Sequence, residues 1–324
     1  MNVTIVGAGA YALSLALKFN KNKNKIIICS FVKEEIEVLN KTKMNERALK
    51  NVKMPSNFIY TCDIRKALEG SNIVVLAVAT KYLSSVCEKI KPYIKDKHIV
   101  IASKGIENDT NSFASNIVKN KLKTRKLCTI SGPSFASDMA KDELIGLSLA
   151  TTNKTTKEVV LKALSSNTLK IRPTRDFLGV ELCGTLKNII AITAGILDGM
   201  GVCKSTKAMF LTESINDTRK LIKKLGGNEK TIVSFAGFGD ILLTCTSNQS
   251  RNYTYGMLLG SSKDKEELEN FLKNNTVEGV YTLKSIYELI KRKRVKMPFI
   301  NLIYNIVFGY EKKENLISFL KEKD

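Results

Sequence analysis

Short apolar runs alternate with amphipathic runs through the first half of the chain. Several apolar runs are apolar almost throughout, as in strands covered on both faces. They predict strands at Val3–Val6, Lys25–Cys29, Phe58–Thr61, Ile73–Val78, Ile99–Ala102, Leu127–Ser131 and Gly146–Ala150. The amphipathic runs predict helices at Ala12–Asn20, Lys33–Asn40, Leu83–Ile90 and Phe113–Lys119. This alternation predicts an α/β fold with a doubly wound, mostly parallel sheet.

The pattern changes after about Arg175, where apolar residues recur at helical spacing. Helices are predicted at Phe177–Leu197, Lys207–Leu225, Tyr253–Leu259, Lys265–Asn274, Tyr281–Lys291 and Phe299–Phe308. We therefore expect two domains, 1–176 and an all-α domain at 177–324. The first of these helices is apolar enough to suggest a membrane span. It contains Glu181, Lys187 and Asn188, however, and so is expected to be a buried core helix.

The charge balance is strongly basic. The 324 residues carry 52 Lys and Arg against 31 Asp and Glu, a formal net charge of +21. Such a charge can serve nucleic-acid binding. The lysines, however, are spread along the chain, and the longest tight basic run is Lys291–Arg294. We expect solvated basic faces and no nucleic-acid partner.

Cysteine and histidine usage restricts the chemistry. The seven cysteines are odd in number, form no C-x-x-C pair and predict buried free thiols in a reducing cytoplasm, with no metal site. The only histidine, His98, has no carboxylate near it in the sequence and is expected to cap the turn before Ile99. Proton transfer would therefore depend on a lysine or a carboxylate.

A glycine-rich turn, Gly7-Ala8-Gly9-Ala10-Tyr11-Ala12, joins the first predicted strand to the first helix. This G-x-G-x-x-A pattern is typical of Rossmann-like dinucleotide-binding domains. Gly7 permits the tight turn, Gly9 lets the backbone approach a pyrophosphate, and the helix N-terminus offers free N–H groups. The plainer alternative is an ordinary tight turn. The second strand is followed by no acid before Glu34, so the choice between NAD and NADP stays open.

Two loops follow later strands, where open α/β sheets bind ligands. Lys104, in Ser103–Glu107, is placed to reach an anion or a carbonyl, although a surface lysine is the simpler interpretation. In Ser131–Ala136, Gly132 allows close backbone approach, and Pro133 suits the first position of a helix. A capped turn without a ligand is the alternative for that loop.

Lys187 lies among small residues on a predicted helix, with Cys183, Gly184 and Ala191 one turn away. Small neighbours leave room for a ligand over the lysine. Desolvation is expected to lower its pKa toward neutrality, which would make it a proton donor and acceptor. The alternative is a lysine that extends its ammonium group from a buried helix to solvent.

A dense polar set follows in the helical half. Asp240 is an isolated acid before an apolar run, a position suited to orienting a lysine. Ser250, Arg251 and Asn252 offer hydroxyl, guanidinium and amide donors at a predicted helix start, which suits a phosphate dianion. A polar loop with a helix cap is the alternative.

These motifs together resemble the bacterial type of NAD(P)-dependent glycerol-3-phosphate dehydrogenase. The resemblance runs from residue 2 to about 310 and includes the specific run from Asp240 to Asn252. The matching segments are Gly7–Ala12, Ser103–Glu107, Ser131–Ala136, Glu181–Ala194, Gly239–Asn252 and Val277–Gly279.

The resemblance implies reversible, NAD(P)H-dependent reduction of dihydroxyacetone phosphate to sn-glycerol 3-phosphate, a phospholipid precursor. It implies a cytoplasmic homodimer with a dinucleotide-binding domain at 1–176 and a substrate-binding and catalytic domain at 177–324. Lys187 would transfer the proton, with Lys104 and Asp240 also catalytic. Substrate contacts would come from Lys104, Gly132, Ser134, Lys187, Asn188, Asp240, Thr244, Ser250, Arg251 and Asn252. Cofactor contacts would come from Gly7, Gly9, Ala10, Tyr11, Phe31, Lys104, Ala136, Arg251 and Glu278.

Some positions depart from the family pattern. Phe31 stands where a basic residue or histidine is common, and Ser205, Glu213 and Ser214 replace a frequent Asn, Arg and Gly. Two other functions remain open at this stage. One is a related dehydrogenase of a small hydroxy acid, and the other is a basic binding protein that senses a dinucleotide without turnover.

Overall fold

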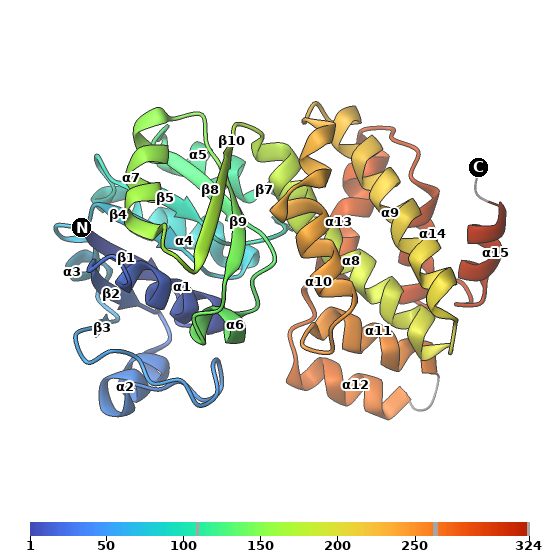
Figure 1. Cartoon of the computed structure of the whole chain (residues 1–324), viewed down its shortest axis with the longest axis horizontal. Coiled ribbons are helices and arrows are strands. Elements are labelled where there is room, and N and C mark those ends of the chain that lie inside the picture. Colours follow the sequence, from blue (N-terminus) through green and yellow to red (C-terminus); the bar gives the residue numbers. More distant parts are fainter. Residues whose placement is uncertain (108–109, 262–264, 323–324) are drawn as a thin grey trace. The chain divides into compact units, whose positions relative to one another are not determined.

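The computed structural model describes residues 1–107, 110–261 and 265–322, which fall into two compact units (Figure 1). The first unit comprises Met1–Lys104 and Phe113–Phe177, and the second comprises Gly105–Ser112 and Leu178–Asp324. Gly105–Ser112, which the sequence assigns to the first domain, thus groups with the helical residues. The strand Ile106–Glu107 in this segment contacts the helix Glu278–Arg292.

An eight-stranded sheet forms the centre of the first unit. Its strands are β1 (Asn2–Val6), β2 (Lys25–Cys29), β3 (Ile59–Thr61), β4 (Ile73–Leu76), β5 (His98–Ile101), β8 (Leu127–Ser131), β9 (Ile145–Ala150) and β10 (Leu169–Thr174). They lie in the order β10-β9-β8-β5-β4-β1-β2-β3. Neighbouring strands are parallel except β8 and β9, which are antiparallel. The predicted doubly wound, mostly parallel sheet is confirmed.

Helices cover both faces of this sheet (Figure 1). They are α1 (Ala10–Asn20), α2 (Lys33–Thr42), α3 (Ile64–Leu68), α4 (Leu83–Ile90), α5 (Ala114–Leu122), α6 (Ala136–Ala140) and α7 (Lys154–Leu164), with short turns η1 (Thr80–Tyr82) and η2 (Lys91–Tyr93). Successive strand residues point to opposite faces. Ile5 accordingly packs in the core that includes α1 and α7, and Val6 packs in the core that includes α4 and α5. This explains why the strands are apolar throughout.

Strand β10 was not predicted from the sequence. Only its first residue, Leu169, is buried, and Lys170, Arg172 and Pro173 are exposed. It is an edge strand that pairs only with β9 in the eight-stranded sheet. Proline and lysine are tolerated at such an edge because one row of backbone groups needs no partner strand. The periodicity that identifies a buried strand is therefore weak here.

The second unit is helical, as predicted. Its helices are α8 (Phe177–Gly199), α9 (Lys204–Lys224), α10 (Asp240–Cys245), α11 (Arg251–Ser261), α12 (Lys265–Asn274), α13 (Glu278–Arg292), α14 (Pro298–Val307) and α15 (Asn315–Glu322). Short helical turns η3 (Glu229–Val233) and η4 (Phe235–Gly239) precede α10, and two-residue strands β6 (Ile106–Glu107) and β7 (Ser112–Phe113) pair with each other.

Helix α8 forms the core of this unit. It is long and apolar enough to cross a membrane, yet 94% of its most apolar window is buried within the fold. A buried core helix of a soluble protein passes the same test of length and composition. Glycines of α8 and α11 allow these two helices to pack backbone against backbone: a side chain on Gly195 or Gly256 would collide with the facing main chain. This close packing sets the position of α11 against α8.

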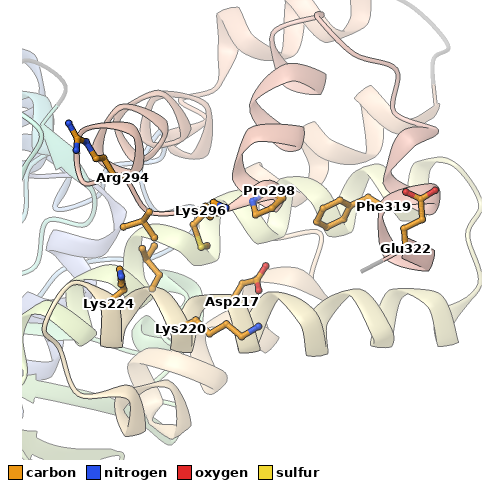
Figure 2. A pocket seen from close by; sticks show the side chains of 11 residues that line it. Asp217, Lys220, Lys224, Arg294, Lys296, Pro298, Phe319 and Glu322 are labelled. Carbon is orange, nitrogen blue, oxygen red and sulfur yellow. The ribbon is translucent and has the colours of Figure 1, made fainter. Parts of the chain in front are cut away.

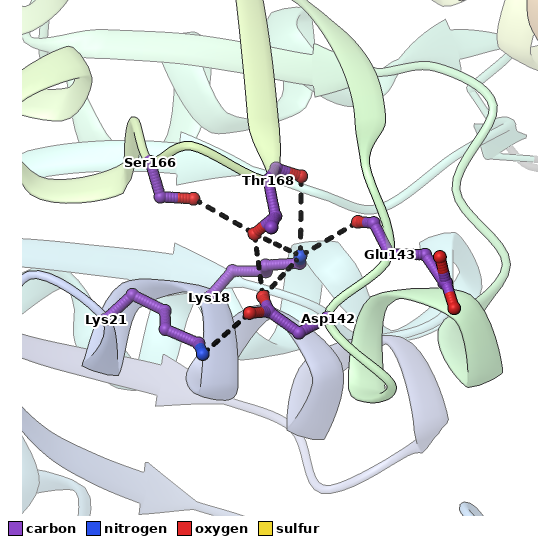
Figure 3. Close-up of polar contacts among 6 residues, drawn as sticks. All are labelled: Lys18, Lys21, Asp142, Glu143, Ser166 and Thr168. Carbon is purple, nitrogen blue, oxygen red and sulfur yellow. Dashed lines mark hydrogen bonds and ion pairs between the residues drawn. The ribbon is translucent and has the colours of Figure 1, made fainter.

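A partly buried polar cluster joins α1 to other segments of the first unit (Figure 3). The ammonium group of Lys18, on α1, is fully buried and donates to Asp142 Oδ1 at 2.9 Å and to Thr168 Oγ1 at 3.1 Å. Lys21 pairs with the other oxygen of Asp142 at 2.7 Å. Because Asp142 follows α6 and Thr168 precedes β10, the cluster joins α1 to two segments that are distant in sequence.

Three local expectations were wrong. His98 does not cap a turn. It is the first residue of β5, buried, with Nδ1 2.9 Å from Thr156 Oγ1. Pro133 is not in a helix, because α6 begins only at Ala136. Among the cysteines, all are free thiols, but Cys62 and Cys203 are exposed.

Candidate functional site

The glycine turn forms a close loop between β1 and α1. Gly7 has a φ of +123°, and a Cβ at this position would lie 2.5 Å from the carbonyl oxygen of Ala77. Only glycine fits such a position without strain. Its N–H donates to the carbonyl of Cys29 at 2.8 Å, which brings the ends of β1, β2 and β4 together at one sheet edge.

The start of α1 is open toward this edge. Gly9 is the N-cap, no side chain caps it, and a Cβ added there would meet no atom within 4 Å. The first N–H groups of a helix lack intrahelical partners and favour negative charge. The loop is therefore shaped for an anion, and Ala10 and Tyr11 form the first turn around it.

A cavity of about 360 Å³ begins at this turn. It is lined by Gly7, Ala8, Gly9, Ser30, Phe31, Val32, Glu35, Ala77, Val78, Ala79, Tyr82, Ser85, Val86 and Lys89. Apolar and aromatic walls with a glycine loop at one side suit an adenosine attached to a pyrophosphate. The residues present therefore fit a dinucleotide, and Phe31, Gly7 and Gly9 of the predicted cofactor set lie together in this cavity.

Three predicted residues meet beside α1. The ammonium of Lys104 lies 5.5 Å from the centre of the Tyr11 ring, within range of a cation–π interaction. Tyr11 Oη lies 3.3 Å from Ser134 Oγ, and the Ser134 hydroxyl donates to the carbonyl of Gly132 at 2.9 Å. The main chain of Lys104 is held by the Thr80 hydroxyl, which donates to its carbonyl at 2.7 Å.

The loop after β8 holds the remaining predicted residues of the first unit. A side chain at Gly132 would collide with the carbonyl of Gly146 on β9, so this position requires glycine. The Ser14 hydroxyl donates to the carbonyl of Ala136 at 2.7 Å and joins α1 to α6. These contacts give the loop a defined conformation beside Tyr11.

Lys187 and Asp240 form a buried ion pair in the second unit. Lys187 Nζ lies 2.7 Å from Asp240 Oδ1, and the two side chains are 11% and 2% exposed. Lys187 also donates to Thr244 Oγ1 at 3.3 Å, while the Thr244 hydroxyl donates to the main-chain carbonyl of Asp240 at 2.6 Å. Asp240 is the first residue of α10, where the helix dipole favours a carboxylate. Asp240 and Thr244 thus hold the ammonium group of Lys187 in a fixed position.

The polar run after α10 ends at the first turn of α11. Arg251 begins this helix and is exposed, whereas Ser250 and Asn252 are buried. Ser250 Oγ accepts from the N–H of Tyr253 at 3.3 Å and so caps the helix, as the alternative interpretation of this run expects. Arg251 thus has a solvent-accessible guanidinium on a fixed helix start.

Asn252 connects this turn to the Val277–Gly279 motif. Its Oδ1 accepts from the N–H of Gly279 at 2.8 Å. A Cβ on Gly279 would lie 2.8 Å from that oxygen and 2.9 Å from the carbonyl of Asn188 on α8. Glycine at this position therefore lets α8, α11 and α13 meet, and Glu278 stands beside them as the first residue of α13.

Sequence reasoning missed three polar residues that line this cavity of about 360 Å³, namely Ser30, Glu35 and Lys89. Glu35 is six residues beyond the end of β2, and Lys89 comes from α4. The available signal for Ser30 and Glu35 was a hydroxyl and a carboxylate five residues apart, on either side of the predicted helix start at Lys33. No local signal relates Lys89 to β2.

Two further features concern other kinds of site. Within residues 1–107, 110–261 and 265–322, no group of three or more His, Cys, Asp or Glu side chains is arranged to hold a metal ion. A separate cavity of about 810 Å³ in the helical unit contains none of the predicted site residues (Figure 2). Lys220 and Lys224 of α9 line it together with Arg294, the last residue of the basic run, and Lys296.

Comparisons with known proteins agree with these motifs. Residues 2–157 match the model for the N-terminus of NAD-dependent glycerol-3-phosphate dehydrogenase, and residues 176–318 match the model for its C-terminus. A glycerol-3-phosphate dehydrogenase (NAD(P)+) of Staphylococcus epidermidis is 34% identical over 295 residues, which is 90% of this chain and 89% of that protein. The corresponding protein of Clostridium botulinum is 32% identical over 96% of this chain and 94% of its own length.

A solved structure shows the same fold. The crystal structure of glycerol-3-phosphate dehydrogenase from Coxiella burnetii aligns with a TM-score of 0.92 at 28% identity and covers 99% of both chains. The match spans both the sheet unit and the helical unit, as the two family models do. The chain therefore belongs to the NAD-dependent glycerol-3-phosphate dehydrogenase family.

Proposed function

We propose that this protein catalyses the reversible, NAD(P)H-dependent reduction of dihydroxyacetone phosphate to sn-glycerol 3-phosphate. The buried pair of Lys187 and Asp240 carries this proposal. A reduction of a ketone to an alcohol needs a proton at the oxygen, and Lys187 is a proton donor held at a fixed position. In this proposal the glycine turn and the cavity beside it bind the dinucleotide.

In this mechanism Arg251, with Ser250 and Asn252, binds the phosphate of the substrate and so fixes the position of its C2 carbonyl. The residues of the glycine turn would hold a reduced nicotinamide dinucleotide, which would supply the hydride for C2. Lys187 then donates its proton to the C2 oxygen, and in the reverse direction it accepts that proton. Asp240 orients the ammonium through its 2.7 Å contact. Lys104 stabilises the negative charge that develops on the oxygen.

The other predicted contacts complete the proposal. Gly132, Ser134, Asn188 and Thr244 are further substrate contacts. The cofactor contacts are Gly7, Gly9, Ala10, Tyr11, Phe31, Lys104, Ala136, Arg251 and Glu278. We also infer a homodimer, which rests on the resemblance alone, and a cytoplasmic location, which rests on the free cysteines. Sedimentation of the purified protein tests the dimer, and a single monomeric species would contradict it.

The activity is tested by following NADH and NADPH oxidation with dihydroxyacetone phosphate and identifying the product as sn-glycerol 3-phosphate. Dihydroxyacetone and small 2-oxo acids without phosphate are the matched controls. Faster turnover of a 2-oxo acid would instead indicate the related hydroxy-acid dehydrogenase. Retention on DNA that is sensitive to salt, with no turnover of any of these substrates, would indicate the non-catalytic binding protein.

A further inference from the structure

The loop after β2 carries a carboxylate that the sequence does not place there. Ser30 follows β2 directly and is buried. Its hydroxyl donates to Glu35 Oε2 at 2.6 Å and accepts from the N–H of Val32 at 3.2 Å. The side chain of Glu35, in the first turn of α2, is thereby held back toward the end of β2.

This carboxylate lines the same cavity as the glycine turn. Phe31 lies beside it with 38% of its surface exposed, which is high for a phenylalanine. The ammonium of Lys89, from α4, lies 4.3 Å from the centre of the Phe31 ring. Lys89 is thus the basic side chain among the residues that line the cavity, and it already contacts an aromatic face there.

The end of the second strand is where dinucleotide-binding folds distinguish the two nicotinamide cofactors. An acid at this place accepts hydrogen bonds from the ribose 2′-hydroxyl, whereas an arginine accommodates a 2′-phosphate. A carboxylate next to a phosphate dianion is also unfavourable, because like charges repel strongly where water is partly excluded. Lys33, the nearest other cation in sequence, is exposed and pairs with Glu37 at 3.5 Å.

We propose that Glu35, positioned by Ser30, selects an unphosphorylated adenosine ribose and so makes NADH the preferred cofactor over NADPH. Glu35 takes the role of the acid that β2 itself lacks, and the ammonium of Lys89 lies over the Phe31 ring. The inference rests on the proposed function only in taking the cavity as the site of a nicotinamide dinucleotide. It concerns binding, and can therefore be measured without turnover.

The experiment is calorimetric titration of the full-length protein with ADP-ribose and with 2′-phospho-ADP-ribose, which contain the adenosine end alone. We expect the wild-type protein to bind ADP-ribose at least tenfold more tightly. Glu35→Gln keeps the size of the side chain but removes its charge, and is expected to narrow that ratio at least fivefold. Glu34→Gln is the matched control, because Glu34 is the adjacent, exposed acid and does not line the cavity. It should leave the ratio unchanged.

Tighter or equal binding of the phosphorylated ligand by the wild-type protein would overturn the inference, as would an unchanged ratio in Glu35→Gln. Failure of both ligands to bind would overturn it as well. Lys89→Met provides a second check: if Lys89 held a 2′-phosphate, this change would selectively weaken the phosphorylated ligand, contrary to our expectation. The wild-type comparison remains decisive even if a variant does not fold.

Turnover separates this inference from the proposed function. A protein that selects ADP-ribose but does not reduce dihydroxyacetone phosphate would retain the cofactor inference and lose the proposed reaction. A protein that reduces dihydroxyacetone phosphate with either cofactor, and binds both ribose ligands equally, would retain the reaction and lose the role of Glu35.

Discussion

Lys187 and Asp240 are 53 residues apart in the sequence, yet Lys187 Nζ lies 2.7 Å from Asp240 Oδ1 and both side chains are nearly inaccessible to solvent. Thr244, one turn after Asp240, also accepts from the same ammonium. Removing either partner of a buried ion pair destabilises the fold, because the remaining charge is left in the interior without a partner. The pair therefore connects the stability of the helical unit with the proposed proton transfer.

Replacing Lys187 should lower kcat, which includes proton transfer, more than it affects substrate binding. Lys187→Met is expected to lower kcat for dihydroxyacetone phosphate by about 10²- to 10⁴-fold, the usual contribution of a general acid. Lys187→Arg is the matched control for folding, since arginine keeps the charge beside Asp240 but does not release its proton in proteins. It should melt near the wild-type temperature and still have a low kcat. Near-native kcat in Lys187→Met would remove this residue from the proton step.

Replacing Arg251 should weaken substrate binding. Arg251→Ala is expected to raise KM for dihydroxyacetone phosphate by about 10- to 150-fold, since a hydrogen bond to a charged group contributes about 1.5–3 kcal/mol. Because Arg251 is exposed, its removal should change the melting temperature little. Steady-state kinetics with and without added inorganic phosphate would measure the effect. An unchanged KM contradicts a phosphate contact.

The two glycines of the first turn should respond differently to the same change. Gly9→Ala adds a methyl group into open space and is expected to preserve stability while weakening dinucleotide binding at least tenfold. Gly7→Ala places a Cβ 2.5 Å from a carbonyl oxygen at a φ of +123° and should destabilise the fold itself. Urea unfolding and NADH titration of both variants measure this contrast. Equal binding by Gly9→Ala and wild type would show that no pyrophosphate approaches there.

In the cluster around Lys18, loss of Asp142 should lower the free energy of unfolding more than loss of Lys18 itself (Figure 3). Asp142→Asn leaves the fully buried Lys18 ammonium without a carboxylate and is expected to cost about 1.5–3 kcal/mol in the free energy of unfolding, the range for a hydrogen bond to a charged group. Lys18→Met should cost less, because Asp142 keeps its ion pair with Lys21. Urea unfolding at neutral pH tests this order, and a larger loss in Lys18→Met would reverse our account of the cluster.

The same cluster predicts acid sensitivity. Burial tends to raise the pKa of Asp142, but hydrogen bonds from Lys21, Thr168 and Lys18 outweigh it and hold that pKa well below its usual range. A carboxyl group with a lowered pKa in the folded state contributes stability above its unfolded pKa of about 3.9 and loses it as the pH falls further. The free energy of unfolding should therefore fall more steeply below about pH 4 in the wild type than in Asp142→Asn. Parallel pH profiles would contradict this expectation.

Ser214 provides a stabilising prediction. Its hydroxyl is buried on α9 and, within the part of the chain that the structure describes, has no hydrogen-bond partner. Ser214→Ala removes an unsatisfied polar atom and is expected to increase the free energy of unfolding by about 1 kcal/mol. Ser205→Ala, at an exposed position of the same helix, should change it by less than about 0.5 kcal/mol. A loss of stability in Ser214→Ala would mean that the hydroxyl has a role which packing does not show.

Local patterns were sufficient for most elements. The strands β1 and β2 and the helices α4 and α12 lie within one or two residues of their predicted bounds, because periodicity and turn residues act over a few neighbours. Strand β10 and the short helices α10 and α15 were not predicted. Strand β10 has one buried residue and carries two charged residues and a proline, so its assignment depends on pairing with the neighbouring strand β9.

Contacts between residues that are distant in the sequence could not be predicted from local patterns. The sequence indicated that Asp240 could orient a lysine, but the contact with Lys187 depends on how α10 packs beside α8. The position of Glu35 depends on a buried serine at the end of β2, and that of Lys89 on the packing of α4 against the same sheet edge. His98 was placed wrongly because a strand position and a turn cap look alike over one or two residues.

The sequence by itself determined the α/β and helical halves, the glycine turn and the family, because these are encoded in local spacing and in motifs that keep their order along the chain. The resemblance assigned Lys187 and Asp240 to one site, but only the tertiary structure showed their direct contact and brought Glu35 to the cavity beside the glycine turn. The physical reason is that hydrogen bonds and ion pairs form over about 3 Å in space. Packing of the whole core, and not distance along the chain, brings such groups together.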